Sequence, residues 1–223
     1  MHKIKSEVWQ ANMSLWENRL VCGTQGNVSG IDPDSGTIYI KPSGVAYSEL
    51  KEEMLVGVGM EGSVKEGTLN PSVDSANHLF LYRNIESARG VCHTHSRFVT
   101  IFSVLKRPVP VFTTAHADVF GSAIPIAEYA DNSGDRIGRS VLEMYRKTGC
   151  NAVILANHGL FSVGDSPQKA AFYALMAEYC AEIAFYSTIM GRSLGEEPPP
   201  LDPDEIKKWF DRYQSKRYGQ KRP

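Results

Sequence analysis

The 223-residue chain is poor in cysteine, has no long apolar run and carries almost no net charge, and each absence excludes a class of protein. Its four cysteines are widely scattered without a Cys-x-x-Cys pair, which argues against a disulfide framework and predicts reduced thiols in the core. No segment approaches the ~20 apolar residues that span a bilayer, and no apolar run follows the opening MHKIKSEVWQ. We therefore expect a soluble cytoplasmic protein without a membrane partner.

The balance of charged residues also limits the possible partners. Lysine and arginine total 24 and aspartate and glutamate total 25, so there is no bulk electrostatic attraction for nucleic acid or an anionic membrane. We expect a small molecule as the partner and no nucleic acid. The length suits one compact α/β domain over residues 1–223, with a charged C-terminal tail over about 202–223.

Hydrophobic periodicity predicts interleaved helices and strands. Residues 3–18 carry an apolar stripe at helical spacing, and two antiparallel hairpins are expected around the turns DPDSG and MEGS. The other expected elements are a helix over 72–85 capped by Ser72, a strand, turn and strand over 151–164, and a long helix from Ser166 towards Gly191. We assign the apolar stripe of that long helix to the core: Phe172, Met176, Tyr179, Ile183, Tyr186 and Met190.

Two of only six histidines, His93 and His95, lie one residue apart in GVCHTHSRF. In a β-strand such residues project from one face, and the apolar spacing after Ser96 predicts a helix with Ser96 at its N-cap. The histidines then form a chelating pair at a strand end or, alternatively, a hydrogen-bonded pair without a metal. Cys92 should face the opposite side of the strand.

A zinc site needs three or four ligands, so the histidine pair requires partners from other segments. His158 lies at the turn of ANHGLF, and Asp74 lies near the start of a predicted helix. Both are positions at the ends of elements, which a fold can bring together. Three histidines and one carboxylate suit Zn²⁺, with Mn²⁺ or Co²⁺ able to substitute, whereas the scarcity of clustered oxygen ligands argues against Ca²⁺.

Three segments rich in glycine, serine and amides suggest a second site: QGNVSG, KPSG and NPSVDS. Small polar side chains and open backbone N–H groups suit phosphate, and a helix starting near Ser72 would direct its positive end at an anion. Lys41 adds a cation beside Ser43 and Gly44, and Asn27 adds an amide. Ordinary turns use the same residue types, so each segment alone is weak evidence.

Six motifs in order along the chain resemble the class II aldolase and L-ribulose-5-phosphate 4-epimerase family: GNVSG, IKPSGV, PSVDSANH, HTHSR, TAHADVF and the terminal YGQ. The resemblance implies a three-layer α/β/α sandwich around a central, mainly antiparallel sheet. It also implies a homotetramer with active sites between subunits, a divalent metal and a phosphorylated ketose as substrate. The implied metal ligands are Asp74, His93, His95 and His158, and the implied phosphate neighbours are Gly26, Asn27, Ser43, Gly44, Ser72 and Val73.

Position 74 favours the epimerase branch of that family. Similar fuculose-phosphate aldolases carry a glutamate there that serves as ligand and base, whereas the epimerases carry aspartate as a ligand only. Proton transfer is then implied for Asp118 of HADVF and Tyr218 of YGQ, which would act on opposite faces during retro-aldol cleavage and re-addition. The alternatives are that Asp118 caps a turn and that Tyr218 is a tail aromatic packed on a neighbour. The residues alone assign no role to Tyr218, which rests on the resemblance.

The chain also departs from the epimerase pattern. Val73 stands where a serine is usual, HADVF replaces HADYF, the segment between Ile124 and Val141 is shorter, and the tail lacks a histidine before its tyrosine. Three functions therefore stay open: epimerisation of L-ribulose 5-phosphate, an aldolase reaction that releases a ketone such as dihydroxyacetone phosphate, and a non-catalytic module similar to the adducin head. The four metal-type residues together favour a catalyst.

Overall fold

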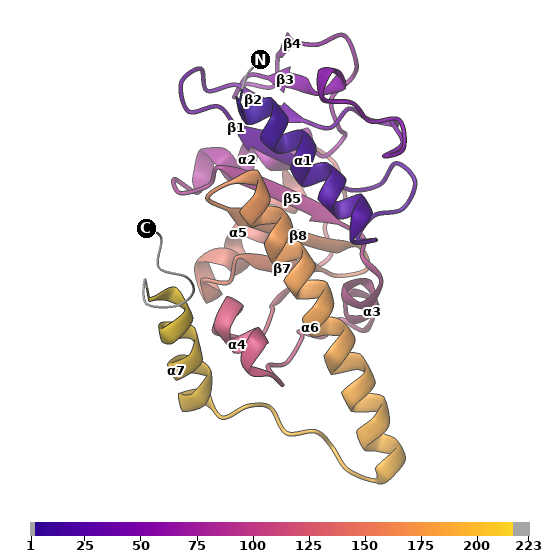
Figure 1. The fold of residues 1–223 in the computed structure, drawn as a ribbon, viewed down its shortest axis with the longest axis vertical. Helices are drawn as coiled ribbons and strands as arrows, with labels where there is room; N and C mark the ends of the chain where they lie inside the picture. The colour runs from indigo at the N-terminus through magenta and orange to yellow at the C-terminus, as the bar shows by residue number, and fades with distance from the viewer. Residues whose placement is uncertain (1–2, 216–223) are drawn as a thin grey trace, which may run out of the picture.

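The structure is a computed structural model that describes residues 3–215, so Tyr218 lies outside the described residues (Figure 1). Within that range there are seven α-helices, eight strands and a short 3₁₀ helix, Glu52–Met54. The helices are α1 Lys3–Glu17, α2 Ser75–Asn84, α3 Arg97–Leu105, α4 Thr114–Phe120, α5 Arg136–Thr148, α6 Pro167–Leu194 and α7 Pro203–Gln214. The strands are β1 Asn27–Ile31, β2 Ile38–Ile40, β3 Val56–Val58, β4 Val64–Glu66, β5 Gly90–Thr94, β6 Ile126–Ala127, β7 Ala152–Leu155 and β8 Gly159–Gly164.

The strands form one sheet in the order β4-β3-β2-β1-β5-β8-β7-β6. All neighbouring pairs are antiparallel except β6 and β7, which are parallel. In the middle of the sheet, β5 pairs with β1 and β8, and His93 lies opposite Asn27 on one side and Phe161 on the other. The last residues of β5 and the first residues of β1 and β8 therefore meet at one end of the sheet.

Helices cover both faces of the sheet (Figure 1). Helices α1 and α6 cross one face with α3 and α4 beside them, and their core includes Val8 and Leu15 of α1. Helices α2 and α5 cover the other face through a second core that includes Leu81 and Ile137. The prediction of an α/β/α sandwich with a mainly antiparallel sheet is confirmed.

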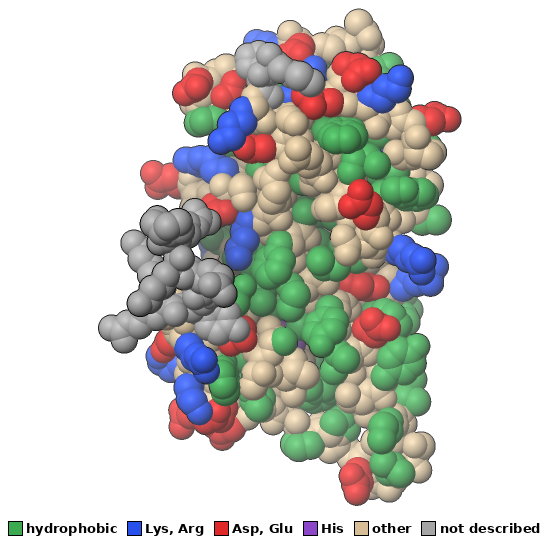
Figure 2. All heavy atoms as spheres, in the orientation of Figure 1, with side chains coloured by type: hydrophobic (Ala, Val, Ile, Leu, Met, Phe, Trp, Pro, Cys, Tyr) green, Lys and Arg blue, Asp and Glu red, His purple; other side chains and the backbone are tan. Residues whose placement is uncertain are grey.

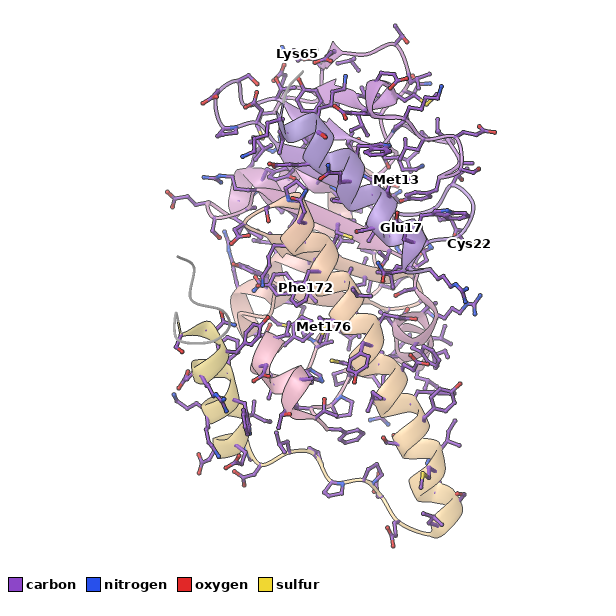
Figure 3. All side chains as sticks on the ribbon, viewed as in Figure 1. Met13, Glu17, Cys22, Lys65, Phe172 and Met176 are labelled. Carbon is purple, nitrogen blue, oxygen red and sulfur yellow. The ribbon has the colours of Figure 1, made fainter. Side chains whose placement is uncertain are left out.

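The long helix α6 forms where it was predicted, but the assignment of its large apolar stripe to the core is wrong for half of the stripe. Tyr179, Tyr186 and Met190 are 47%, 56% and 65% exposed, while Phe172 and Met176, labelled in Figure 3, are partly buried against the core. The buried face of the helix is instead built from alanines: Ala170, Ala174, Ala177, Ala181 and Ala184. Small side chains let α6 approach the sheet closely, so its larger side chains point outward.

Two local expectations are also corrected. The helix expected from Ser72 begins at Ser75 with Asp74 at its N-cap, because the Ser72 N–H bonds the Lys41 carbonyl (3.1 Å) and keeps this residue beside the end of β2. Cys22 is exposed in the loop after α1 (Figure 3), whereas the other three cysteines are buried, and all four are free thiols. The two hairpins form as β1–β2 and β3–β4.

The charged tail begins with α7, which packs against α4. Gly121 ends α4 in the left-handed region (φ 63°), and the Phe210 ring of α7 lies where a Cβ on this glycine would be. A larger residue at Gly121 would separate the two helices. No helix in the described range is both long and apolar enough to span a bilayer.

Candidate active site

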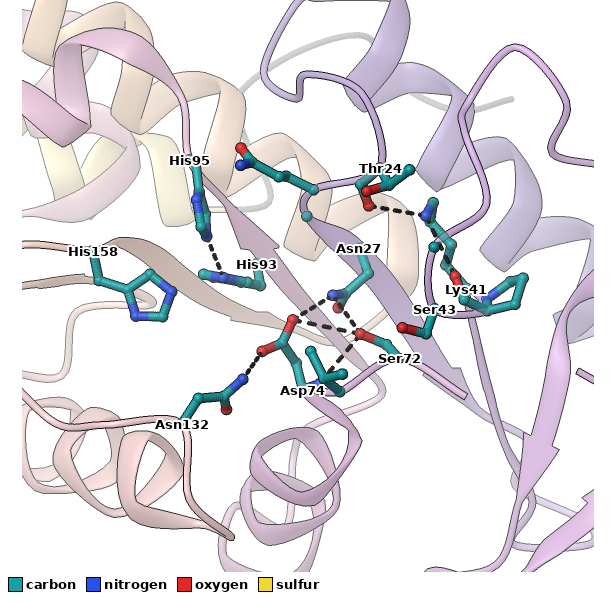
Figure 4. Close-up of a pocket in the computed structure, with 15 residues that line it drawn as sticks. Thr24, Asn27, Lys41, Ser43, Ser72, Asp74, His93, His95, Asn132 and His158 are labelled. Atoms are coloured by element: carbon teal, nitrogen blue, oxygen red, sulfur yellow. Dashed lines mark hydrogen bonds between the residues drawn. The ribbon is translucent and has the colours of Figure 1, made fainter. Parts of the chain in front are cut away.

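A pocket of about 230 Å³ lies where β1, β5 and β8 meet (Figure 4). All four predicted metal ligands and all seven predicted substrate-binding residues line it. Four lining residues were missed by sequence reasoning: Thr24, Gln25, Pro42 and Asn132. The complete lining is Thr24, Gln25, Gly26, Asn27, Lys41, Pro42, Ser43, Gly44, Ser72, Val73, Asp74, His93, His95, Asn132 and His158.

Strand pairing brings the three histidines together. His93 is within β5, His95 follows the end of that strand, and His158 precedes β8 in the turn from β7. The turn approaches β5 so closely that a Cβ on Gly159 would lie 2.3 Å from the Thr94 carbonyl oxygen. Glycine is required there for the His158 turn to reach the histidine pair.

The three imidazoles form a nearly equilateral triangle. Their ring centroids are 4.7 Å apart for His93 and His95, 5.0 Å for His93 and His158, and 4.9 Å for His95 and His158. His93 Nδ1 lies 2.9 Å from the Leu160 carbonyl oxygen, an acceptor only, so the proton is on Nδ1 and Nε2 presents its lone pair to the centre. His95 Nε2 is 2.8 Å from that His93 Nε2, so both ring nitrogens face the same point.

Asp74 lines the pocket, but the close group of metal-type ligands in the described residues comprises the three histidines without it. Its carboxylate accepts hydrogen bonds from the Asn27 amide (2.8 Å) and from the Asn132 amide (3.2 Å). Asn132 is itself oriented, because its Oδ1 accepts from Asn77 Nδ2 (2.9 Å). Amide donors from two segments therefore hold Asp74 at the side of the histidine triangle.

The phosphate-type residues lie at the other end of the pocket. The Ser43 and Ser72 N–H groups already bond the Asn70 and Lys41 carbonyls, which leaves the Gly44 and Val73 N–H groups without protein partners in the described part of the chain. Lys41 is 1% exposed, its Nζ donates to the Thr24 carbonyl (3.1 Å), and no carboxylate among the described residues pairs with it. Burial lowers the pKa of Lys41 to about 8.

Comparisons with known proteins agree with this geometry. Residues 6–185 match the family described as the class II aldolase and adducin N-terminal domain. The chain belongs to the class II aldolase family. It is 36% identical over 233 residues to L-ribulose-5-phosphate 4-epimerase UlaF of Salmonella paratyphi B, an alignment that covers 99% of this chain and 100% of that protein.

Solved structures of this family share the fold. An L-fuculose 1-phosphate aldolase superposes with a TM-score of 0.83 at 28% identity and covers 96% of this chain and 98% of its own. YgbL of Klebsiella pneumoniae, a putative aldolase/epimerase/decarboxylase, superposes with a TM-score of 0.79 at 27% identity and covers 93% of this chain and 97% of its own. The similarity therefore extends over nearly the whole chain.

The class II aldolase family depends on divalent metals, and the histidine group fits such an ion. One nitrogen from each ring lies within 4.8 Å of the other two, and tetrahedral Zn–N bonds of about 2.0–2.1 Å would draw the nitrogens to about 3.3 Å apart. Burial, reinforced by the neighbouring imidazoles, lowers the pKa of His95 to about 4 and also lowers the pKa of His158. Both rings are then neutral near pH 7, the form that binds a metal.

Asp74 supplies a negative charge beside the three histidines. Burial by itself raises the pKa of this carboxyl, but nearby His93 and His78 and the hydrogen bond from Asn27 outweigh that effect, so the pKa lies below its ordinary value. The side chain is therefore ionised at neutral pH, and it is 7% exposed. A carboxylate beside the histidine triangle adds the negative charge that a divalent cation favours.

Of the two predicted proton-transfer residues, the structure describes only Asp118, and it does not bring Asp118 into this pocket. Asp118 lies on α4, outside the lining, and Tyr218 lies beyond the described residues. The Asp118 Oδ1 atom is buried without a hydrogen-bond partner in the part of the chain that the structure describes. Burial raises the pKa of Asp118, and the opposing charge of Arg212 on α7 only partly offsets this. Within one described chain, Asp118 is thus separate from the metal and phosphate residues.

Proposed function

We propose that the protein is a metal-dependent L-ribulose-5-phosphate 4-epimerase, which interconverts L-ribulose 5-phosphate and D-xylulose 5-phosphate. The observation that carries the proposal is the histidine triangle of His93, His95 and His158 placed beside a phosphate-type pocket. The 36% identity to an epimerase over the whole chain supports the same reaction. Aspartate at position 74 is the residue that the epimerase branch carries.

In this proposal the chain's residues bind the phosphate end of the substrate and would hold a divalent ion at its ketone end. The Gly44 and Val73 N–H groups, the Ser43 hydroxyl and the Lys41 ammonium bind the phosphate. A divalent ion, held by the three histidines with Asp74 beside them, supplies Lewis-acid stabilisation of the negative charge that develops on the ketone oxygen.

The stereochemical change needs two proton-transfer groups. One group takes the proton from the C4 hydroxyl as the C3–C4 bond breaks, which leaves a three-carbon fragment and an aldehyde. After the aldehyde turns over, the bond re-forms on its other face, and a second group returns a proton to the new hydroxyl. We assign these roles to Asp118 and Tyr218.

We further propose a homotetramer with shared active sites. Asp118 lies outside its own chain's pocket, so it must act on the pocket of a neighbour if it is catalytic. Large apolar side chains exposed along α6, including Tyr186, Ile189 and Met190, provide surface for subunit contact (Figure 2). Four free cysteines are consistent with a cytoplasmic location, and Zn²⁺ is the proposed ion, with Mn²⁺ or Co²⁺ as substitutes.

A class II sugar-phosphate aldolase is the second candidate. The L-fuculose 1-phosphate aldolase that superposes with a TM-score of 0.83 favours it. A non-catalytic, adducin-head-like module is the least favoured, because it has no use for the histidine triangle. A panel of phosphorylated ketoses, assayed for the 4-epimer and for free aldehyde, tests the proposal: epimer without accumulated aldehyde is expected, and stoichiometric aldehyde would support the aldolase instead.

A further inference from the structure

Helix α3 connects two of the three histidines, and its attachments involve residues outside the pocket. His95 lies one residue before Ser96, the N-cap of α3, and the opposite end of α3 contacts the turn that carries His158. His93, in contrast, is fixed within β5 and by the Leu160 carbonyl. The separation of His95 from His158 therefore depends on how both ends of α3 are held.

The N-terminus of α3 is held by a carboxylate from α6. The Phe98 N–H donates to Glu178 Oε1 (2.9 Å) and the Val99 N–H donates to Glu178 Oε2 (3.0 Å). A serine at an N-cap ordinarily accepts such bonds, but the Ser96 side chain makes no cap bond and its buried Oγ has no partner in the described range. Glu178 thus replaces the cap and adds a negative charge at the positive end of the helix.

The other end of α3 holds the His158 turn through Ser103. This side chain is fully buried, and its Oγ accepts the His158 N–H at 2.8 Å, while its carbonyl oxygen accepts the Asn157 N–H at 3.1 Å. The His158 N–H also lies 3.1 Å from the Leu155 carbonyl oxygen, so Ser103 is the shorter of two acceptors. Asn157 has a φ of 58°, in the left-handed region that asparagine adopts more readily than most residues, and these bonds help to hold the turn there.

We propose that Glu178 and Ser103 are positioning residues for the metal centre, acting through α3 on His95 and His158 respectively. This inference rests on the proposed function, since it requires that the histidine triangle binds a metal. Neither residue lines the pocket or touches the histidine rings. Outer groups that orient metal ligands typically contribute about 10–100-fold to metal affinity, and we expect an effect of that size from each.

The experiment compares two variants with two matched controls, one a serine of equal burial on β8 and the other a glutamate on the same helix α6. Ser103→Ala is paired with Ser162→Ala, because Ser162 is equally buried and its hydroxyl donates to the Ala170 carbonyl (2.8 Å) on the sheet face opposite His93. Glu178→Gln is paired with Glu182→Gln, one turn further along α6. Each apoprotein is titrated with Co²⁺ against a chromophoric chelator, the visible spectrum of the Co²⁺ form is recorded, and thermal unfolding of the apoprotein is followed.

The expected result is that Ser103→Ala and Glu178→Gln weaken Co²⁺ binding about 10–100-fold and alter the Co²⁺ spectrum, while both controls bind like the wild type. Affinities of Ser103→Ala and Glu178→Gln equal to those of their controls would overturn the inference, whatever their thermal stability. If Ser103→Ala does not fold, the Glu178 pair alone decides. A wild-type protein that binds no Co²⁺ refutes the proposed metal centre itself, an outcome distinct from wild-type-like binding by the two variants.

Discussion

Asp118 offers the sharpest test of a shared active site, because it lies outside the pocket that contains its own chain's histidines. The perturbation is a mixture of two inactive variants, His95→Ala and Asp118→Asn. The first removes a proposed metal ligand, and the second removes a proposed acid or base while the metal residues stay intact. Asp118→Asn alone should lose roughly two or more orders of magnitude in turnover, the usual scale for a positioned proton-transfer group. His95→Ala alone should be inactive because it loses its metal.

The size of the recovery follows from the arrangement of subunits. If each site takes its histidines from one chain and Asp118 from the next, two independent choices must both be correct. Random equal mixing in a cyclic tetramer then restores about a quarter of the sites. If Asp118 instead serves its own chain's histidines, every site retains one lesion and no activity returns.

A third variant locates Tyr218 relative to Asp118. Because α7 packs on α4 and the chain continues from α7 to Tyr218, we expect both residues to serve the same neighbouring site. Mixtures of His95→Ala with Tyr218→Phe should also recover about a quarter of the sites, whereas Asp118→Asn with Tyr218→Phe should recover none.

The assay is epimerase turnover after co-expression, with mixed tetramers verified by native mass spectrometry. Verified mixed tetramers of His95→Ala and Asp118→Asn that are no more active than their parents would refute the shared role of Asp118. If activity then recovers only in mixtures of His95→Ala with Tyr218→Phe, Asp118 acts within its own chain or has a structural role.

Further predictions concern three single variants. His95→Ala should lose its bound metal and retain its fold, and stoichiometric metal by plasma mass spectrometry would show that the ligand assignment is wrong. Inorganic phosphate should inhibit the enzyme less as the pH rises through about 8, because the buried Lys41 loses its charge there. Inhibition constants measured over this pH range should lose that dependence in Lys41→Met. The same pH dependence in the variant and the wild type would exclude Lys41 from phosphate binding. The folded-state pKa of Lys41 is below the ordinary 10.5, so the folded wild type gains stability relative to the unfolded chain as the pH rises from about 8 towards 10.5. Any excess thermal stability of Lys41→Met over the wild type should therefore shrink over that range. Asn132→Ala should lower kcat/KM about tenfold, because Asp74 loses one of its amide donors, and wild-type kinetics would assign Asn132 a passive role.

The sequence alone predicts much of the sheet and the histidine pair, because both follow from a two-residue period. Strand alternation places His93 and His95 on one face, and Cys92 packs in the core between the sheet and helices α1 and α6, as expected. The sequence motifs also identify the segments that meet at the pocket. The assignment of those segments to phosphate depends on the family resemblance, since glycine and serine in turns indicate no particular ligand by themselves.

The residues that sequence reasoning missed have no periodic signal. Asn132 acts from a loop, and Glu178 is a polar residue on a helix whose pattern concerns only apolar side chains. Both depend on contacts between segments far apart in the chain: Asn132 with Asp74, and Glu178 with Phe98 and Val99. Such contacts are set by packing, which a local pattern does not contain.

The error on α6 carries information about assembly. A helix that covers a sheet normally buries its largest apolar side chains, yet α6 buries alanines and exposes Tyr186, Ile189 and Met190. The alanine face brings α6 close to the sheet, so the outward apolar side chains are not needed for the subunit's own core. Their periodicity over the second half of the helix is explained if a neighbouring copy covers them. If Asp118 is catalytic, its position outside its own pocket requires a neighbouring copy for a separate reason, and the mixing experiment tests that requirement.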